Sequence, residues 1–551
     1  MSTVSPTPFP ANGHRQLSPR EAMQRLKALS CTLPKDGKPR CSGQVHVGLF
    51  FDGTGNNKQL DYDSLPPDKR KHSNVVRLFQ SHRDTPTAGY FRHYISGVGT
   101  PFPEIGDTNH PDGKWPGGSA FAEKGEHRIV WGLLQLINSV HRYVYQAPLI
   151  QPAQDKIIVN NLAGITNPAA MRRVAMKTWQ DKLKAALAGA KPEVEQINVS
   201  VFGFSRGAAE ARAFCNWLFD VCEPEGGGWR FAGIPLRVAF LGVFDTVASV
   251  GMANLFDDGV LAGHQSWADD NLEIHPAVER CVHFVAGHEV RACFPLDSVR
   301  VKTRYPGNAK EVMYPGAHSD VGGGYAPGDL GVSPCHSDMF SIIPGASMYQ
   351  EARLSGVPLL PLDALGPDDK QALQPSDAAI QQFNGYLQDA RAGAAPVEQL
   401  LSHHMALYFS YRFKYRHQFE SRPLFTRANP THQSYLRQTQ STLISRLTQL
   451  EQGDPMDPAF DPAQAARAYR QRQMKLEAAT GIQGYAKDTL RMQRLCAVAA
   501  QIDVRKVTPH VEAFLENSVH DSMAGFMRQL DEYRRNGIGF VKFRTVFKGN
   551  D

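Results

Sequence analysis

Residues 201–212 are VFGFSRGAAEAR, and Gly203, Ser205 and Gly207 within them form the pattern Gly-x-Ser-x-Gly. The apolar run Ile197–Phe202 leads into this pattern, and an alanine-rich segment suited to a helix follows it. A serine on a sharp turn between a strand and a helix is the arrangement of a nucleophile elbow. The two glycines remove side chains that would collide with neighbouring backbone. The stretch predicts a reactive serine at the rim of a sheet, and its alternative is a tight connection without chemistry.

Further apolar runs rich in Val, Ile and Phe lie on both sides of this turn. Each is followed closely by Gly or Asp, and the segments between them are long enough to hold helices. Near-continuous apolar strands that alternate with helices indicate a mainly parallel sheet covered by helices on its faces. The predicted strands are Gln44–Phe51, Ile197–Phe202, Leu236–Phe244 and Cys281–Val285, and the predicted crossover helices are Glu126–Tyr145 and Pro168–Leu187, the second with Asn167 as its N-cap.

The change of pattern along the chain divides it into three regions. Residues 1–41 form a polar, proline-containing arm without apolar periodicity, and residues 42–345 form the α/β core with insertions. Residues 346–551 are mainly helical, and we expect them to pack on the core and to offer a possible membrane or partner surface. The predicted elements there are helices over Ser347–Ser355 and Ser441–Gln452, one from Asp461-Pro462 to near Gly481, one starting at Thr508-Pro509, and a strand over Gly539–Phe547.

Composition excludes several classes of protein. The 551 residues carry 60 Lys and Arg against 54 Asp and Glu, with no long basic tract, so we expect no nucleic-acid partner. The eight cysteines include no Cys-x-x-Cys pair, which argues against a thiolate metal site and leaves one optional disulfide, between Cys31 and Cys41. The N-terminus lacks the apolar segment of a signal peptide. We therefore expect synthesis in the cytoplasm and no membrane span.

A serine nucleophile requires an imidazole to take its proton and a carboxylate to orient the imidazole. In this arrangement the chain order is serine, acid, histidine. Asp245 directly follows the apolar strand Leu236–Phe244, at the edge where parallel strands carry their functional loops, although an Asp there can also cap a turn. His318 lies in a glycine-rich segment able to carry an imidazole over this edge. We predict Ser205, Asp245 and His318 as the catalytic residues.

Two more side chains compete for roles near this base. His520, in Val519-His520-Asp521-Ser522, is an alternative base, because geometry and not chain position decides which imidazole serves a triad. Asp320, two residues after His318, either binds a cation or holds the loop in place. We favour the second role for Asp320.

An early loop offers backbone N–H groups for an oxyanion hole. The strand Val45–Phe51 runs into Asp52-Gly53-Thr54-Gly55, and in this arrangement one donor follows the nucleophile while the other comes from such a loop. We therefore predict Arg206 together with Gly53 or Thr54. Asp52 also permits two alternatives, a turn without chemistry and the nucleophile of a magnesium-dependent phosphatase. The phosphatase would need further carboxylates, and none follows Asp52 closely.

Four stretches taken together resemble the type VI secretion system phospholipase effectors of the first lipase class. They are LFFDGTGNN (49–57), GFSRGAAEAR (203–212), FDTVAS (244–249) and PGAHSDVGGGY (315–325). Many esterases share Gly-x-Ser-x-Gly, whereas these four stretches in this order form a specific combination. The resemblance covers residues 42–345, with a weaker likeness at VHDSMAGF (519–526). It implies an α/β-hydrolase core in which Ser205, Asp245 and His318 are the triad.

The resemblance also implies a function and partners. It implies a phospholipase A type of serine carboxylester hydrolase that cleaves acyl esters of membrane glycerophospholipids through an acyl-enzyme. It further implies an antibacterial toxin carried by the spike protein of the secretion system, injected into a target cell to act in its periplasm or at its membranes, and neutralised in the producer by a cognate immunity lipoprotein. No cofactor is predicted, and calcium is left open. The alternative is a catalytically silent hydrolase-fold module that docks on a secretion partner.

A membrane substrate suggests a search for an interfacial surface. Leu401–Glu420 contains six aromatic residues with several Lys and Arg, a mixture suited to the headgroup boundary. The same mixture suits a core helix whose basic side chains lie along apolar neighbours. We favour the core helix.

Overall fold

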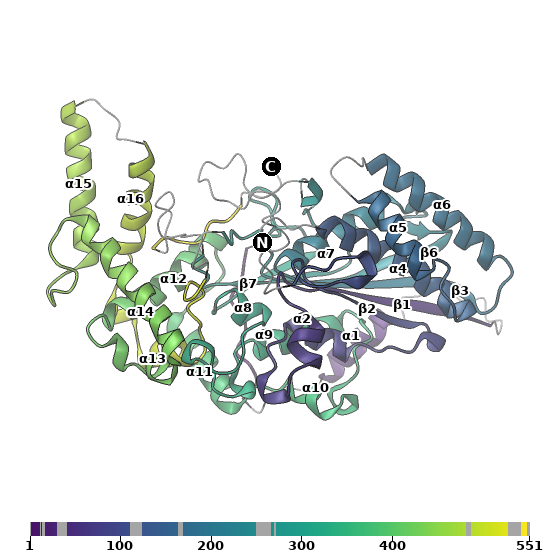
Figure 1. Cartoon of the computed structure of the whole chain (residues 1–551), viewed down its shortest axis with the longest axis horizontal. Helices are drawn as coiled ribbons and strands as arrows, with labels where there is room; N and C mark the ends of the chain where they lie inside the picture. The colour runs from purple at the N-terminus through teal and green to yellow at the C-terminus, as the bar shows by residue number, and fades with distance from the viewer. Residues whose placement is uncertain are drawn as a thin grey trace.

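The structure of the chain, a computed structural model, is built around a mainly parallel β-sheet (Figure 1). It describes residues 2–11, 13, 17–29, 41–110, 124–163, 169–248, 266–268, 272–291, 293–480, 486–526 and 541–547. Within these residues the sheet has eight strands, and the parallel ones follow the order β2-β1-β3-β6-β7-β8. Their bounds are β1 (Ser42–Phe51), β2 (Tyr90–Ile95), β3 (Glu193–Phe204), β6 (Ile234–Phe244), β7 (Cys281–Ala286) and β8 (Ala309–Tyr314). The short β4 (Glu223–Glu225) and β5 (Gly228–Phe231) pair antiparallel beside the start of β6.

Helices cover both faces of the sheet (Figure 1). One face carries α4 (Gly125–Tyr145), α5 (Pro152–Leu162), α6 (Ala169–Leu187) and α7 (Arg206–Asp220), and the other carries α2 (Asn74–Ser81) and α9 (Ile342–Leu354). Side chains alternate between the two cores along each strand: Leu49 and Phe51 join the first, and Phe50 joins the second. The layered arrangement confirms the predicted α/β-hydrolase-like fold.

The elements predicted around Ser205 are present. The four predicted strands are β1, β3, β6 and β7, each at least one residue longer than predicted. Of the predicted crossover helices, Glu126–Tyr145 is α4 and the second is α6, while Asn167 and Pro168 lie outside the described residues. The cystine candidate Cys31 also lies outside them. Strands buried on both faces give a continuous apolar signal, which is why these elements were recognisable.

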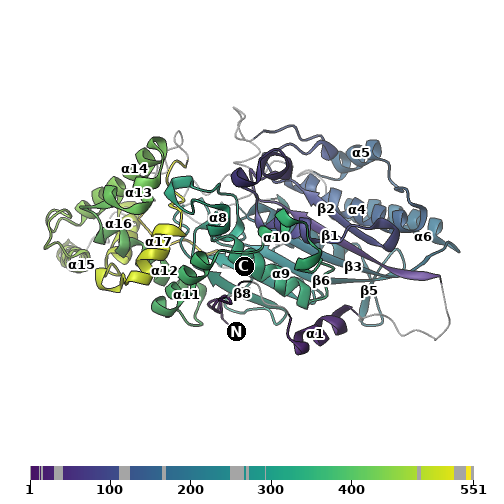
Figure 2. The same ribbon diagram turned by 90° about the horizontal axis from the view of Figure 1, so that it is seen from below.

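Of the helices from α10 onward, all but α10, which lies beside α2, gather at one end of the sheet (Figures 1 and 2). These helices are α10 (Pro367–Gln371), α11 (Asp377–Ala390), α12 (Val397–Lys414), α13 (Pro423–Arg427), α14 (Pro430–Leu447), α15 (Pro462–Thr480), α16 (Ala486–Ala499) and α17 (Pro509–Asn517). Two predicted helix starts are confirmed. Thr508 Oγ1 accepts a hydrogen bond from the Val511 N–H before α17, and Asp461 Oδ1 accepts one from the Ala463 N–H before α15.

The helical region shares a hydrophobic core with the sheet. Phe340 packs edge-on against Phe514 of α17, with ring centroids 5.1 Å apart, and also contacts Phe383 of α11. The same continuous core extends to Phe50 and Phe202 in the central strands. The predicted boundary after residue 345 falls inside α9. Together with α2, the helices from α9 onward therefore cover a face of the sheet that would otherwise be exposed to water.

The N-terminal arm contains structure that its polarity did not predict. The helix α1 (Pro19–Leu29) packs beside α9, where Arg25 Nη1 donates to the carbonyl oxygen of Arg353 at 2.7 Å. Val4 extends the sheet edge, because its N–H donates to the Glu311 carbonyl and its own carbonyl accepts from the Met313 N–H. No residue of α1 is buried.

The aromatic and basic stretch Leu401–Glu420 is mostly internal. Residues of α12 such as Met405, Phe409 and Tyr411 are buried in the shared core. Arg412 is buried as well, and its guanidinium donates to Asp521 Oδ2 at 2.6 Å. This confirms the core-helix interpretation and overturns the interfacial one for this stretch. Among the described helices, none has the length and apolarity needed to cross a bilayer.

Candidate active site

Ser205 lies on a strained turn between β3 and α7. Its φ of 58° and ψ of −125° fall in a backbone region that residues other than glycine rarely adopt. A Cβ atom on Gly203 would lie 2.4 Å from the Gly207 carbonyl oxygen, and one on Gly207 would lie 2.3 Å from the Asp52 carbonyl oxygen. The start of α7 thus packs directly against the backbone at the ends of β3 and β1. This close packing is the physical reason for the two glycines of the pattern.

Asp245 lies beside Ser205 because β3 and β6 end in register. Phe204 pairs with Phe244, and the Ser205 N–H donates to the Phe244 carbonyl at 3.0 Å. The Val247 N–H returns a bond to the Ser205 carbonyl at 3.3 Å. Asp245 also has a positive φ, 40°. Two consecutive strand ends therefore hold the serine and the carboxylate on adjacent strained residues.

His318 opens the short helix α8 (His318–Gly322), which follows β8. Its Nδ1 lies 2.5 Å from Asp245 Oδ2, and its ring centroid lies 4.7 Å from that of Phe204, the residue before Ser205. Among the described residues, Nε2 of His318 has no hydrogen-bond partner, so its bond with Ser205 Oγ is not formed here. Contacts between nucleophile and base are often loose before substrate binds. The structure brings the three predicted residues to one edge of the sheet.

Burial and charge act in opposite directions on this pair. Burial lowers the pKa of His318, and the hydrogen bond with Asp245 opposes that shift only in part. Burial would also disfavour the charged form of Asp245, yet Arg544 and His318 hold the pKa of this carboxyl well below its ordinary value. An ionised Asp245 beside a neutral imidazole is the protonation state that general-base catalysis requires.

Arg544 is a site residue that sequence analysis missed. Its Nη1 donates to Asp245 Oδ1 at 2.7 Å and its Nη2 donates to Asp245 Oδ2 at 2.8 Å. The Ala286 N–H donates to the same Oδ1 at 2.8 Å. Arg544 belongs to the stretch predicted as a strand, which within its described part forms an isolated parallel bridge between Val546 and Leu296. No local pattern marks an arginine that is brought to the site by tertiary packing.

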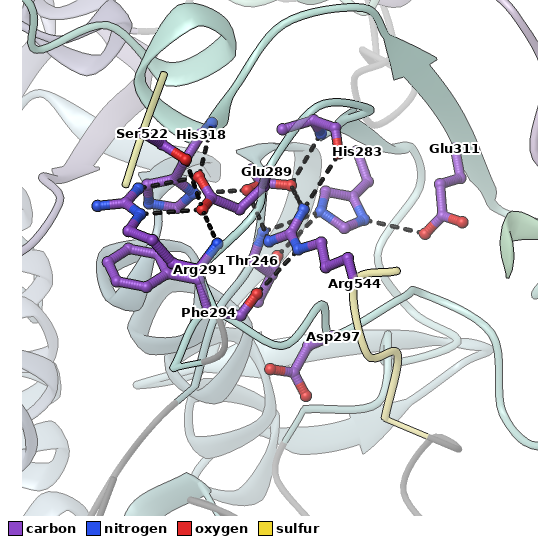
Figure 3. Close-up of polar contacts among 12 residues, drawn as sticks. Thr246, His283, Glu289, Arg291, Phe294, Asp297, Glu311, His318, Ser522 and Arg544 are labelled. Carbon is purple, nitrogen blue, oxygen red and sulfur yellow. Dashed lines mark hydrogen bonds and ion pairs between the residues drawn. The ribbon is translucent and has the colours of Figure 1, made fainter. Parts of the chain in front are cut away.

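A second buried ion pair supports the backbone of His318 (Figure 3). The His318 N–H donates to Glu289 Oε2 at 3.2 Å, and Arg291 binds both oxygens of Glu289 at 2.9 Å. The Ser522 hydroxyl donates to Glu289 Oε1 at 2.9 Å, so the region after α17 reaches the site as well. Although burial opposes ionisation, the Arg291 charge lowers the pKa of Glu289 to about 2.

A third buried pair, His283 and Glu311, holds Thr246, the residue that follows Asp245 (Figure 3). The Thr246 N–H donates to His283 Nε2 at 3.1 Å, which leaves the proton of His283 on Nδ1. That Nδ1 lies 3.0 Å from Glu311 Oε2 and donates to it. The residue that follows Asp245 is thereby fixed to β7 and β8.

His520, the alternative base, has a carboxylate of its own. Its Nδ1 lies 2.5 Å from Asp320 Oδ1, its N–H donates to Asp320 Oδ2 at 3.0 Å, and its ring stacks on Tyr325 with centroids 3.8 Å apart. Asp320 Oδ2 also accepts from the Ala317 N–H. Asp320 therefore holds the loop of His318 in place, as favoured from the sequence. The described contacts of Ser205 join it to the Asp245 strand end and not to His520.

Comparison with known proteins identifies the family. The model of the type VI secretion system phospholipase effector Tle1-like catalytic domain matches residues 46–222 and 228–351. The chain belongs to this family. The matched residues include Ser205, Asp245 and His318, whereas Arg544 lies beyond the match. No curated protein matches the chain.

Two solved structures are similar to this chain to different degrees. A crystal structure of an uncharacterized protein from Pseudomonas aeruginosa is 26% identical, with a TM-score of 0.77, and the match covers 99% of this chain and 84% of that one. The similarity in fold therefore includes the C-terminal helices of this phospholipase effector. A structure of the Tle1 effector bound to the VgrG spike is 23% identical over 53% of both chains, and its TM-score of 0.29 is too low to compare the folds.

In this effector the loop after β1 lies against both sides of the elbow. A Cβ atom on Gly53 would lie 2.5 Å from the Phe204 ring, and Gly207 meets the Asp52 backbone on the other side. The Gly53 N–H, one predicted oxyanion donor, donates instead to Asp52 Oδ1 at 2.8 Å. Arg206 opens α7, and first-turn N–H groups point out of the helix end. The bond of the Gly53 N–H to Asp52 leaves Thr54 as the other predicted second donor.

Asp52 itself is buried and engaged. The Tyr94 hydroxyl donates to its Oδ2 at 2.6 Å, and the Gly53 N–H occupies its other oxygen. Burial raises the pKa of Asp52 to about 6. These contacts tie the loop to β2, a structural role in keeping with the turn alternative. Among the described residues of the effector, no group of three or more His, Cys, Asp or Glu side chains could hold a metal ion.

Proposed function

We propose that this effector is a serine carboxylester hydrolase of phospholipase A type, which cleaves acyl esters of membrane glycerophospholipids with Ser205, His318 and Asp245 as its triad. The observation that supports the proposal most strongly is the placement of Ser205. It stands on a strained elbow directly beside the buried Asp245–His318 couple. Family membership supports the phospholipid substrate.

The proposed reaction has two halves. Ser205 Oγ attacks the ester carbonyl carbon while His318 Nε2 takes the hydroxyl proton, and Asp245 stabilises the imidazolium that forms. When the tetrahedral intermediate collapses, the bond to the glycerol oxygen breaks and this oxygen receives the proton from His318. A water molecule then attacks the acyl-enzyme by the same route. Fatty acid leaves, and Ser205 regains its proton.

The negative charge on the tetrahedral oxygen requires fixed donors. We assign these to the N–H groups of Arg206 and Thr54, with Gly53 supporting the loop through its bond to Asp52. Removing one such donor typically costs about 3 kcal/mol of transition-state stabilisation, or on the order of a hundredfold in rate. The proposed steps themselves need no metal ion, and activity measured with and without a chelator tests whether calcium is required.

We further propose the delivery that family membership suggests. The spike of the secretion system would carry the effector into a neighbouring bacterium, where it would act on membrane lipid from the periplasm. A cognate immunity lipoprotein would protect the producing cell. Growth competition against cells that lack the lipoprotein, with wild-type and Ser205→Ala effectors, tests this chain of events.

The reaction itself is tested by Ser205→Ala. We expect this variant to keep the native circular-dichroism spectrum, to release no fatty acid from phospholipid vesicles above background, and to escape labelling by a fluorophosphonate. Ser441→Ala, which alters an exposed serine of α14, is the matched control and should behave as wild type. Undiminished fatty-acid release from Ser205→Ala would falsify the proposal. A wild-type chain that neither labels nor releases fatty acid would favour the silent docking module.

A further inference from the structure

The C-terminal segment 541–547 inserts a charged side chain next to the proposed triad. Arg544 and Asp245 are both fully buried, and they meet in a two-bond fork with N···O distances of 2.7 and 2.8 Å (Figure 3 shows Arg544 in place). A planar guanidinium matched to a carboxylate fixes the orientation of both groups. Arg544 thereby holds both oxygens of Asp245, including Oδ2, which also bonds to His318.

With Arg544 in place, all acceptor positions of Asp245 are used. Oδ1 accepts from the Ala286 N–H and from Arg544, while Oδ2 accepts from His318 Nδ1 and from Arg544. A carboxylate offers about four lone-pair sites. The carboxylate cannot rotate without breaking several bonds at once, so its Oδ2 stays directed at the imidazole.

Arg544 is itself fixed by the core. Its Nε donates to the Phe294 carbonyl at 2.8 Å, and Nη1 also reaches the Ala286 carbonyl at 3.2 Å. Two backbone hydrogen bonds join the segment of Arg544 to Leu296: the Leu296 N–H donates to the Thr545 carbonyl, and the Phe547 N–H donates to the Leu296 carbonyl. The arginine is thus a built part of the site and not a surface side chain that happens to reach it.

Each buried carboxylate around His318 has a polar partner when Arg544 is counted. Besides Asp245, the titratable or charged groups that face the site are Glu289, Arg291, Asp320, Tyr325, His520 and Arg544. Glu289 is neutralised by Arg291, and Asp320 is engaged with His520. Asp245 is neutralised by Arg544. Without Arg544, one full negative charge would stand unbalanced against the imidazole.

We propose that Arg544 is a positioning residue of the hydrolase: it orients Asp245 toward His318 and balances its charge, so that the imidazole stays neutral and able to accept the Ser205 proton. This inference rests on the proposed function. It makes the base depend on a segment that lies beyond the family's catalytic domain, at the far end of the chain. Catalytic competence is then coupled to the docking of residues 541–547.

The pH dependence of the rate separates this role from a merely structural one. General-base catalysis fails once His318 is protonated, and the acid limb of the profile of kcat/KM reports that protonation. An unbalanced carboxylate favours the imidazolium. Arg544→Met should therefore move the acid limb upward by about one pH unit and lower kcat. Arg544→Lys keeps the charge without the fork, so it should lower kcat while the limb stays where it is in wild type.

The experiment uses the full chain and p-nitrophenyl butyrate, a soluble ester that avoids pH effects on vesicles. Profiles are recorded for wild type, Arg544→Met, Arg544→Lys and Arg505→Met, the last a control at an exposed arginine paired with Asp503. Circular dichroism verifies folding. If Arg544→Met does not fold, Arg544→Gln replaces it. If neither folds, the Arg544→Lys profile decides, because a limb displaced by about one unit with the charge retained would overturn the proposal.

The outcomes distinguish this proposal from the proposed function. An upward shift in the neutral variant together with an unshifted lysine variant supports the role of Arg544. An equal loss of rate in both variants with no displacement of either limb means that Arg544 only stabilises the fold, and it overturns the proposal. Ser205→Ala is measured in parallel. Hydrolysis by Ser205→Ala would show that the triad assignment, and not the role of Arg544 alone, is wrong.

Discussion

At the scale of single residues, backbone strain marks the chemistry. Ser205 and Asp245 are neighbouring strand ends, and both have a positive φ. Such conformations cost on the order of 1–3 kcal/mol each and persist only where surrounding contacts fix them. Here the contacts are short bonds between β3, β6 and β7 and the glycine-to-backbone packing of the elbow. Strain held this firmly keeps the hydroxyl and the carboxylate in one relative position.

The elbow glycines can be tested directly. Gly207→Ala places a Cβ atom 2.3 Å from the Asp52 carbonyl oxygen, backbone that cannot move without shifting β1. We expect a loss of stability of about 1–3 kcal/mol and a large loss of fluorophosphonate labelling. Gly307→Ala is the matched control, because its Cβ atom would meet open space. Thermal unfolding and labelling of the two variants should differ clearly, and equal behaviour would argue against a tightly packed elbow.

Each of the three proposed catalytic residues could be proposed from its local sequence, whereas the residues that hold them in place could not. Ser205 and Asp245 follow strongly apolar strands, and His318 lies in a distinctive glycine-rich stretch. Arg544 and Glu289 carry no local sign of their role, since each reaches the site through contacts with distant segments. Gly53 was predicted as a donor, but its N–H turns to the adjacent Asp52 carboxylate, a detail of side-chain geometry.

At the scale of elements, α7 carries an acid whose burial affects stability. Glu210 is fully buried, and neither of its oxygens has a hydrogen-bond partner among the described residues. Burial raises its pKa from 4.5 to about 8, although the Arg128 and Arg206 charges oppose this shift. The folded protein therefore holds a proton that the unfolded chain has already released. Between these two pH values, stability is lost as the pH rises.

The loss of stability with rising pH leads to a prediction for Glu210→Gln. The variant cannot ionise, so its free energy of unfolding should fall less than that of wild type between pH 5 and pH 7. We expect a difference of about 2 kcal/mol, since one pKa unit corresponds to about 1.4 kcal/mol. Urea unfolding at the two pH values measures it. Glu104→Gln, at an exposed position, should show the wild-type slope, and an unchanged slope for Glu210→Gln would contradict the assignment.

Helices and strands were predictable where burial imposes an apolar run or an apolar stripe on the sequence. The strands β1, β3, β6 and β7 are apolar on both faces, and α4 has an apolar stripe. The edge strand β2 buries only Phe91 and Ile95, and α1 buries none. Neither therefore gives a strong signal. The helix α14 starts at Pro430, well before the predicted Ser441. Its first half is polar, so the Asn429 cap and Pro430 are the only sequence signals of the true start.

At the scale of the whole molecule, the C-terminal region completes the catalytic domain. It covers one face of the sheet with the shared core that joins Phe340 and Phe514. It also supplies Ser522 to Glu289, His520 to Asp320 and Arg544 to Asp245. The fold similarity to the Pseudomonas aeruginosa protein over 99% of this chain agrees with a single architectural unit.

A chain that ends at residue 345 should therefore not work as a separate domain. It would expose the apolar face that the C-terminal helices cover and would leave Asp245 without Arg544, a buried charge without its partner. We expect it to be insoluble or to lack cooperative unfolding, and to give no fluorophosphonate labelling. Co-expression with residues 346–551 is the complementary test, and it should restore part of the labelling. A soluble, fully labelled 1–345 chain would contradict this view of the molecule.

The most direct test of the central claim is product analysis on a phospholipid with two different acyl chains. Wild type, Ser205→Ala, His318→Ala and His520→Ala are compared, each with its native fold verified. We expect wild type to release fatty acid and lysophospholipid, and Ser205→Ala and His318→Ala to fall to background. His520→Ala should keep measurable activity, because Asp245 and His318 remain paired. Release at the wild-type rate by His318→Ala, with loss in His520→Ala, would contradict the assignment of the base.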